Sequence, residues 1–575
     1  MTRREAWLSV LLVSVVALAI RVWAASVITF ARPEDTAYYV GVARNLVSGA
    51  GLVTNAIWSF GAPPLEFPRP AFEVWLPLPS LLAAVPMTFL GTTFAAAQWS
   101  SILVGTLVAV LTWRLAADVA EERGLTPGRA RTLGLGAGLT AAVFLPLVFH
   151  SVLPDSTIPF AALVLFVCLL AGRIARDPQG MQLTDRRLLG LGVALGLAAL
   201  TRNEAVWLAL GWTFMAWGIS GGIGAGVRLG AGVRLGAGVR LGAGVRLGAG
   251  VRLGPRERLR PWLRLVAGAA IPAIAIFMPW AIRDWIVFGN PLPGQALTNA
   301  LSLTGGDIFA WADRPTLDRY LAAGLPTLLA FRWEGFVHNL VSVLLLTGLP
   351  ITAIGLVALP WTGRGSSLRL LAIFSILTFV TTTLLFPVAT TWGTFLHASA
   401  AVLVLLVVAA LAALDNLIAM IGARRGWTRP VAWCGPFLTV AAGVLFTMVL
   451  IPSFGRGGDR VRDQYAALPA ALAAAGLPIG PDLGPVIARS PIWLAEETGV
   501  KTLALPDETP ADVLSLARAF PGTTVVISGT NDGERWPSVA LTDPVGIQCF
   551  EPVPLIDPQG RGIFDDIRVF RITCP

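Results

Sequence analysis

Residues 7–39 read WLSVLLVSVVALAIRVWAASVITFARPEDTAYY, a long apolar run followed directly by charged and aromatic side chains. A helix needs roughly 20 mostly apolar residues to cross the hydrocarbon core of a bilayer, and residues 7–30 provide them. The run follows Met-Thr-Arg-Arg, but it is too long for a signal peptide and has no small-residue cleavage site. It therefore predicts a retained membrane anchor.

Further apolar runs repeat this pattern along the chain. Of the 575 residues, 55% are hydrophobic and 13% are charged, whereas about a quarter of the residues in a soluble domain are charged. The sequence thus predicts an α-helical polytopic membrane protein with about eleven spanning helices within residues 1–453. The further runs lie at about 94–116, 132–153, 156–173, 188–201, 203–222, 263–282, 337–360, 369–388, 396–420 and 431–452.

The placement of arginines predicts the orientation of the helices. Cytoplasmic loops carry an excess of basic residues, and a cytoplasmic N-terminus puts all the basic stretches on that side. These stretches run from Arg114 to Arg131, Arg173 to Arg187, Arg228 to Arg264, Arg364 to Arg369 and Arg424 to Arg429. The same loops account for the net charge of +9, so nucleic-acid binding is not expected. We expect a multi-pass protein of the plasma (inner) membrane.

The alternate segments are then expected to face outward. They are residues 31–93, the turn at Pro154-Asp155, residues 284–336, residues 389–395 and everything after residue 453. This assignment requires that the apolar stretch 74–90 does not span. Three prolines interrupt that stretch, which favours an interfacial or re-entrant helix in the first outer loop: Pro77, Pro79 and Pro86.

Residues 224–253 are five tandem copies of Gly-Ala-Gly-Val-Arg-Leu, expected in the cytoplasm. A hexad with two glycines is a poor helix former, and each copy adds one arginine. Attraction to anionic lipid headgroups is one interpretation. We favour the other, a low-complexity linker without catalytic consequence.

Residues 454–575 predict a small extracytoplasmic α/β domain. Strands are expected at 485–488, 501–505, 523–528 and 564–572, with helices at 492–498 and 510–520. The segment carries no Gly-rich phosphate loop and no catalytic triad, so no chemistry is assigned to it. Cys549 and Cys574 lie in it, and both a disulfide and two unpaired thiols remain open.

The first outer loop, residues 31–93, concentrates the polar side chains that favour chemistry. Asp35 is followed by Tyr38 and Tyr39, and the apolar spacing after it predicts a helix lying along the membrane surface. Asp35 is either a simple N-cap of that helix or a functional carboxylate. The loop's glutamates, Glu34, Glu66 and Glu73, are interpreted as solvated charges.

The residues of this loop resemble those of a known family. Asp35-Thr-Ala-Tyr-Tyr, Ala43-Arg44-Asn45-Leu46 and Leu76-Pro77-Leu78 are similar to the first outer loop of the GT-C glycosyltransferases. The likeness is greatest to bacterial relatives of the protein O-mannosyltransferases and of the aminoarabinose transferases that modify lipid A. It extends over roughly residues 1–300 through three later stretches: Leu153-Pro154-Asp155-Ser156, Gly196 to Glu204, and Pro279 to Asp284.

The resemblance implies transfer of a sugar from a polyprenyl-phosphate donor to an extracytoplasmic glycan, lipid or protein acceptor, with inversion. It implies Asp35 as the base, desolvated by Tyr38, Tyr39 and bound lipid. Asp155 is expected to assist Asp35 or, with it, to hold a divalent cation; no cofactor is otherwise expected. The lipid tail would lie in a groove between helices.

The leaving phosphate would need cations. Arg202 and Arg283 fall at outer helix ends and suit this task because a guanidinium binds two phosphate oxygens; Arg44 or Arg69 are the alternatives. His397 is a candidate for sugar or phosphate binding. The ordinary alternatives are snorkelling arginines and a histidine bonded between helices. Trp58, Trp75 and Trp392 are candidates to stack on a sugar or to serve as interfacial anchors.

Two other classes of protein compete with the enzyme. A transporter or flippase would place charges and broken helices near the bilayer midplane, often in repeated halves, whereas the acidic residues here cluster at the outer edge. A catalytically silent relative that assembles the cell envelope would tolerate the loss of Asp35.

Overall fold

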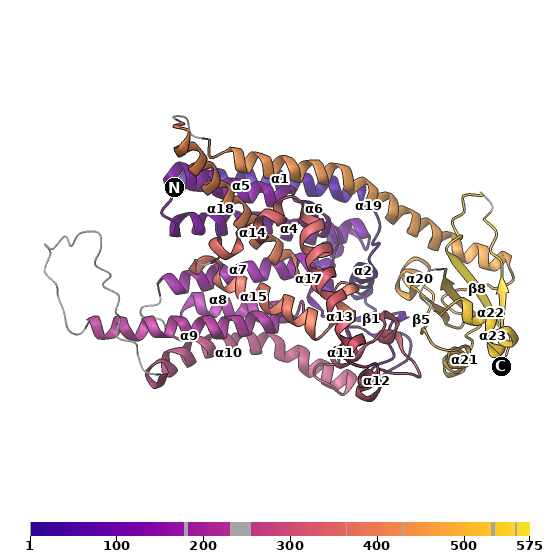
Figure 1. Ribbon diagram of the computed structural model, residues 1–575. Coiled ribbons are helices and arrows are strands. Elements are labelled where there is room, and N and C mark those ends of the chain that lie inside the picture. Colours follow the sequence, from indigo (N-terminus) through magenta and orange to yellow (C-terminus); the bar gives the residue numbers. More distant parts are fainter. Residues whose placement is uncertain are drawn as a thin grey trace, which may run out of the picture.

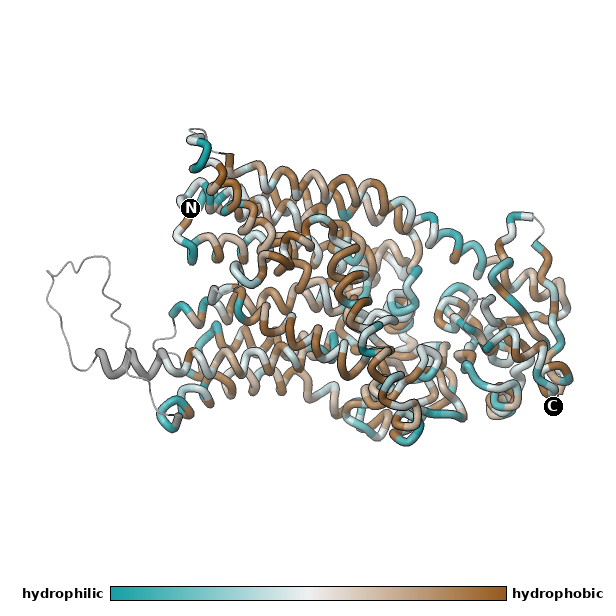
Figure 2. Tube along the Cα trace, in the orientation of Figure 1, coloured by the Kyte–Doolittle hydropathy of each residue, from teal (hydrophilic) through white to brown (hydrophobic). Residues whose placement is uncertain are grey.

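The structure is a computed structural model that describes residues 2–177, 182–230, 255–363, 365–427, 431–530, 535–557 and 560–574. Long helices lie side by side in a bundle, and a small domain with a sheet is attached at one end (Figure 1). We call this end the domain end; the start of α1 lies at the opposite end. Hydrophobic segments dominate the bundle, and hydrophilic ones are frequent in the attached domain (Figure 2).

Eight helices in the described ranges are long and apolar enough to cross a bilayer. The expectation of a polytopic membrane protein is confirmed, whereas the number of spans stays a prediction. The eight are α1 (Arg3–Val27), α4 (Phe94–Glu122), α7 (Thr157–Arg176), α10 (Pro255–Phe288), the continuous segment Leu325–Gly348, α15 (Ser366–Leu384), α18 (Ala400–Arg424) and α19 (Cys434–Ala474). The bundle also contains α3 (Leu78–Leu90), α5 (Pro127–Val143), α6 (Leu145–His150), α8 (Arg186–Ala199), α9 (Ala205–Gly230) and α14 (Ile351–Thr362).

Helix α18 forms the centre of the bundle. Every residue from Ala400 to Ala412 is buried, as expected for a helix that is apolar on all sides. It packs along α14 and also contacts α5, α7 and α15. The helices around it expose their outward apolar side chains, as lipid-facing surfaces do.

Two of the predicted spans are broken by proline. The run 132–153 divides into α5 and α6 at Phe144, because Pro146 cannot donate a backbone hydrogen bond to Ala142. The freed carbonyl of Ala142 instead accepts a hydrogen bond from the buried guanidinium of Arg21, at 3.0 Å. The hydroxyl of Thr447 donates to the next carbonyl, that of Val143, at 2.7 Å.

The predicted run 337–360 is not one helix. Its helical path begins earlier, as α13 (Leu325–Val337), and continues as a π-helical turn (η2, His338–Leu345) and a 3-10 turn (η3, Leu346–Gly348). A break at Leu349–Pro350 follows, and α14 resumes the path. Pro350 disrupts regular hydrogen bonding there, which apolarity alone could not indicate.

The helix expected after Asp35 is present as α2 (Glu34–Val47). All of its residues from Thr36 to Ala43 are buried against other parts of the protein, and its expected position along the membrane surface stays a prediction. Helix α3 packs on one side of it, and α20 (Pro491–Thr498) of the attached domain packs on another. Gly41 permits this approach, since a Cβ atom there would lie 1.8 Å from the carboxylate of Glu496.

The attached domain is built on a six-stranded sheet in the order β2-β5-β4-β6-β8-β7. Strands β2, β5, β4 and β6 are parallel, and β8 and β7 pair antiparallel. The strands are β2 (Ala56–Ile57), β4 (Val486–Ala488), β5 (Thr502–Ala504), β6 (Val525–Gly529), β7 (Phe550–Val553) and β8 (Ile567–Ile572), and the helices are α20, α21 (Pro510–Ala519), α22 (Ser538–Thr542) and α23 (Pro544–Cys549).

The α/β character expected of this region is confirmed, with every predicted strand and helix present. The sequence missed β7, and it missed β2, which comes from the first outer loop. The expected boundary between residues 453 and 454 falls inside α19, which continues to Ala474. Cys549 and Cys574 form a disulfide, which resolves the alternative left open above.

Short elements complete the domain end of the bundle. They are β1 (Val53–Thr54) and β3 (Arg69–Pro70), which pair antiparallel, and α11 (Ala296–Leu301), η1 (Gly305–Phe309), α12 (Leu317–Ala322), α16 (Pro387–Thr391) and α17 (Thr394–Ala398). The Gly-Ala-Gly-Val-Arg-Leu repeat predicted at 224–253 lies mostly outside the described residues.

The two ends of the bundle are expected to lie on opposite sides of the membrane. Ser48 is exposed at the end of α2, near the attached domain, and Gly128 is exposed near the start of α1, where Arg131 pairs with Glu5. With Cys434 replaced by serine, cysteines at Ser48 and Gly128 should react with an impermeant maleimide from opposite sides. Labelling of both from one side would contradict the predicted orientation.

Candidate active site

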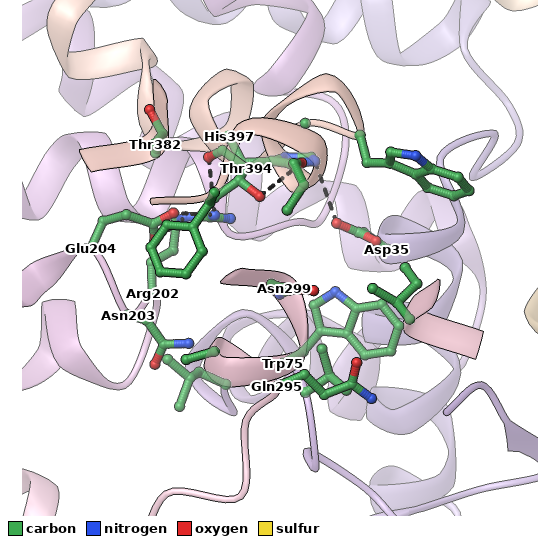
Figure 3. A pocket seen from close by; sticks show the side chains of 18 of the residues that line it. Asp35, Trp75, Arg202, Asn203, Glu204, Gln295, Asn299, Thr382, Thr394 and His397 are labelled. Atoms are coloured by element: carbon green, nitrogen blue, oxygen red, sulfur yellow. Dashed lines mark hydrogen bonds and ion pairs between the residues drawn. The ribbon is translucent and has the colours of Figure 1, made fainter. Parts of the chain in front are cut away.

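A cavity of about 430 Å³ opens at the domain end of the bundle. Its wall is formed by segments far apart in the sequence, and Figure 3 shows many of their side chains. They are α2 with the loop up to residue 76, the α8–α9 turn, residues 295–308, and residues 382–397. The first outer loop and the outer loop at residues 284–336, called the large outer loop below, were predicted separately and meet at this one site.

Asp35 lies on the wall of this cavity and contacts His397. Its Oδ2 is 3.3 Å from Nε2 of His397 (Figure 3), and Nδ1 of the same ring is 3.0 Å from the hydroxyl of Thr157. Burial lowers the pKa of His397, so the ring is neutral and can donate from Nε2 while Nδ1 accepts. The N-cap interpretation of Asp35 was wrong, because the N-cap is Pro33 and no side chain caps the helix.

Arg202 also lines the cavity, in the turn between α8 and α9. Its guanidinium pairs with Glu204 at 2.8 Å (Figure 3) and donates to the hydroxyl of Ser156 at 2.8 Å. Burial alone would lower the pKa of Arg202, but Glu204, with smaller contributions from Tyr39 and Asp35, offsets it and raises the pKa. The cation is therefore retained in a mostly buried position, held by a carboxylate in a fixed direction.

Asp155 lies behind this wall, outside the cavity lining. Its carboxylate accepts the backbone N–H of Thr157 at 2.8 Å and contacts Nδ1 of His150 at 3.4 Å. Burial would raise the pKa of Asp155, but the hydrogen bond from His150 and nearby charges bring it below its ordinary value. His150 had no predicted role; only its proximity to Asp155 in the sequence could have indicated one.

Asp155 belongs to a group of three side chains that could hold a cation, whereas the predicted pair of Asp35 and Asp155 stays a prediction. His150, Asp155 and His397 offer ligand atoms that all lie within 4.8 Å of one another. Two imidazoles with one carboxylate suit zinc or another first-row metal better than magnesium, which prefers oxygen ligands. Asp35 touches this group through His397.

The two tyrosines have different positions. Tyr39 lines the cavity, whereas Tyr38 is buried beside it, its hydroxyl accepting the backbone N–H of Phe72 at 2.6 Å. The ring of Tyr38 packs against Trp75, with ring centres 4.3 Å apart. Tyr38 therefore supports the wall from behind.

Three predicted arginines lie outside the lining and serve the surrounding structure. Arg69 is buried and pairs with Glu73, and it donates to the carbonyl of Ala62 at 2.9 Å. Arg283 pairs with Asp284 at 2.8 Å and lies over the ring of Trp280. The structure does not bring either of them to the cavity.

Arg44, the third, links α2 to the attached domain through Glu496, at 2.8 Å. Glu34, two residues before the buried stretch of α2, is also covered by α20, and burial raises its pKa to about 8. The interpretation of Glu34 and Glu73 as solvated charges was therefore wrong; Glu66 is exposed as expected.

Sequence reasoning missed several polar residues of the wall. Glu204 and Asn203 stood next to Arg202 in the quoted stretch, but they were assigned no role. Gln295 and Asn299 come from the large outer loop, where no motif pointed to them. Trp58, Trp75 and Trp392, the candidates for stacking, all line the cavity.

The attached domain fastens one wall of the cavity. Glu508, in the loop before α21, is only 5% exposed and accepts three consecutive backbone N–H groups, of Trp311, Ala312 and Asp313, at 2.8 to 3.0 Å. These residues directly follow η1, which contributes Gly305 and Ile308 to the lining. The domain therefore positions the large outer loop as well as the first one.

Comparison with known proteins shows the fold. The sequence matches no known family model and no curated protein. The crystal structure of ArnT from Cupriavidus metallidurans bound to undecaprenyl phosphate is similar, with a TM-score of 0.52 and 13% identity, over 98% of this chain and 97% of that one. Its apo state gives 0.51 and 14%, over 99% and 98%.

A third similar structure is the apo oligosaccharyltransferase of Archaeoglobus fulgidus, with a TM-score of 0.48 and 13% identity, over 97% of this chain and 75% of that one. ArnT is an aminoarabinose lipid A transferase of the GT-C superfamily. The chain has the GT-C membrane fold, as the resemblance of its first outer loop predicted. At this identity the likeness extends to the fold alone.

Replacing Glu508 should loosen the wall without touching the cavity itself. Glu508→Ala leaves three backbone N–H groups without their charged acceptor, and bonds to charged groups contribute about 1.5–3 kcal/mol each. We expect a melting temperature lower by several degrees and faster proteolysis within residues 305–316. Asp482→Asn, an exposed change in the same domain, is the control. An unchanged cleavage pattern in Glu508→Ala would contradict this role.

Proposed function

We propose that the chain is a glycosyltransferase that moves a sugar from a polyprenyl phosphate to an acceptor outside the cytoplasm. The observation that supports this proposal most strongly is a single cavity that is lined by Asp35, Arg202 and, on one side, apolar residues. A base, a cation and a place for a lipid are the three groups that this reaction requires. The full-length likeness in fold to a transferase crystallised with undecaprenyl phosphate supports the proposal.

The apolar side of the cavity suits the lipid tail. Val206 and Trp207 of α9 line it, as do Phe386 and Val388 beside α15. Exposed apolar residues lie farther along the same two helices, including Phe214, which is 61% exposed, and Leu384, which is 48% exposed. A prenyl chain would leave the cavity along these helices and remain in the membrane.

Asp35 would accept the proton of the acceptor's hydroxyl or amine. The acceptor atom then forms a bond to the anomeric carbon of the donor, while the bond from that carbon to the phosphate oxygen breaks. The electron pair leaves with the polyprenyl phosphate, and attack from the opposite face inverts the anomeric centre. His397 would orient Asp35 through its Nε2–H, so that one carboxylate oxygen stays directed at the acceptor.

Arg202 would stabilise the leaving phosphate. Its bonds to Glu204 and Ser156 fix the guanidinium before the donor binds, and this fixed position lowers the cost of organising charge in the reaction. Arg44, Arg69 and Arg283 lie outside the cavity lining, so we favour Arg202 over these three alternatives for this contact.

We assign Asp155 a supporting role. Together with His150 it would hold the region behind His397, or contribute to a divalent cation bound by the two histidines. In either case the proton at the acceptor is taken by Asp35, because only Asp35 of the two aspartates lines the cavity.

The domain end would be the extracytoplasmic side of the plasma membrane. The Cys549–Cys574 disulfide supports this placement, since disulfides persist in oxidising compartments.

The transporter alternative is less favoured. Arg21, a buried charge within α1, donates to the carbonyls of Ala17 and Ala142 at a helix break, which is a structural task.

Asp35→Asn should abolish most of the activity while leaving the fold intact. Loss of a general base costs about 10²–10⁴ in rate. We expect a cell that carries only this variant to lose the modified envelope glycan and to accumulate the lipid-linked sugar, measured by mass spectrometry. Glu66→Gln, an exposed change in the same loop, should behave as the unmodified protein.

A variant Asp35→Asn with unchanged turnover would remove this carboxylate from the mechanism. It would favour the interpretation of the chain as a silent relative.

A further inference from the structure

Four aromatic residues at the cavity form one continuous row. Ring centres are 4.7 Å apart between Trp75 and Trp58, 4.9 Å between Trp58 and Phe309, and 5.8 Å between Phe309 and Trp392. The row crosses three segments: the first outer loop, η1 and the residue between α16 and α17. Its three tryptophans line the cavity.

These tryptophans are not simple membrane anchors. Trp58 and Trp75 are half-buried and are packed against each other at an interplanar angle of 53°. Trp75 is backed by Tyr38, whose hydroxyl is itself fixed by the backbone of Phe72. A rigid set of aromatic faces at the wall of a polar cavity is a binding surface, because the rings need no reordering when a ligand arrives.

Trp392 completes the row at its open end. Its indole nitrogen lies against Gly305, where an added Cβ would be only 2.0 Å away. Trp392 is nevertheless 56% exposed, so part of its ring surface remains available to a ligand. Glycine at position 305 therefore lets the large outer loop and the α16–α17 connection meet face to face.

The other polar groups of the lining indicate what the row would bind. Among the charged side chains of the lining, Asp35 contacts His397 and Arg202 pairs with Glu204, and the proposed function assigns Asp35 to the acceptor and Arg202 to the phosphate. The lining also holds the amides of Asn203, Gln295 and Asn299. Amides can both donate to and accept from hydroxyl groups, and they offer no full charge to a charged substituent.

A sugar ring matches this combination. One face of a pyranose presents several C–H bonds, which carry slight positive charge and pack well on the negative face of an aromatic ring. Its hydroxyls at the ring edge suit the amides. The cavity volume of about 430 Å³ falls within the range of roughly 300–1,000 Å³ that is usual for small-ligand sites.

We propose that Trp58, Trp75 and Trp392, with Asn299 and Gln295, form a subsite for a sugar ring without charged substituents. The inference rests on the proposed transferase function, and it narrows the substrate to a neutral sugar. The ring could belong to the donor's sugar or to a glycan acceptor, and both share this chemistry.

The subsite is tested by saturation-transfer NMR on the purified full chain in detergent. The probes are methyl glycosides of glucose, mannose and arabinose, together with methyl glucuronide and methyl glucosaminide as charged counterparts. At least one neutral glycoside should receive saturation at its ring C–H protons and bind about tenfold more tightly than its charged counterparts. Equal or tighter binding of the charged glycosides would overturn the proposal.

Substitutions locate the contact. Trp392→Leu should weaken the neutral glycoside about tenfold or more, and Trp392→Tyr, which keeps an aromatic face, should largely restore it. Trp333→Leu is the matched control, since Trp333 is an exposed tryptophan of α13 outside the lining. Unchanged binding in Trp392→Leu, with an unchanged melting temperature, would overturn the assignment.

Two further measurements separate the sources and the hypotheses. Polyprenyl-phosphate glucose, once bound, displaces the methyl glycoside if the subsite takes the donor's sugar and leaves it in place if the subsite takes the acceptor. Asp35→Asn should keep the glycoside contact while losing transfer. If transfer depends on Asp35 but no glycoside contact is detected, the subsite is refuted and the transferase function is not. If the glycoside binds but no transfer depends on Asp35, the transferase function is refuted and the subsite is not.

Discussion

The contact between Asp35 and His397 joins the first outer loop to the segment that leads into α18, the central helix of the bundle. His397 is held in turn by Thr157 at the start of α7. Contacts with these two parts of the core therefore fix the position of the Asp35 carboxylate, although its own helix, α2, belongs to the first outer loop. Loops move more than the elements they connect, and this contact keeps the proposed base in a defined place.

The attached domain has a comparable effect from the other side. It takes β2 from the first outer loop into its own sheet, and it holds the large outer loop through Glu508. Helix α20 also covers α2, the helix that carries Asp35. The cavity wall thus depends on contacts among the first outer loop, the large outer loop and the attached domain. The sequence assigned no chemistry to this domain, but the structure gives it a role in holding the site together.

Much of this organisation follows from the sequence, because apolar length and basic loops are strong local signals. The GT-C fold, the α/β domain and the place of Asp35 on the cavity wall agree with what residues 1–300 and 485–572 predicted. Burial was harder. Arg44 and Arg69 occur in the correct loop, but their carboxylate partners, Glu496 and Glu73, decide that they face away from the cavity. Glu496 is far from Arg44 in the chain, and even the pair Arg69–Glu73, four residues apart, does not reveal from the sequence alone whether it faces the cavity.

The same limit explains the other errors. The path of α13 to α14 is set by a break at Pro350, and apolarity continues across it. Strand β2 is two residues long and exists only because β5 lies beside it. Gln295 and Asn299 reach the cavity because Glu508 and Asp307 fold the loop around them, and amides without a motif look like ordinary loop residues.

The central claim is that the cavity beside Asp35 receives a lipid phosphate. Cryo-electron microscopy of the full chain in nanodiscs, with and without added undecaprenyl phosphate, tests it most directly. We predict added density for a phosphate between Arg202 and Asp35, with a chain that leaves past Val206 and Val388. An empty cavity at saturating lipid, or the phosphate bound elsewhere on the bundle, would contradict the account.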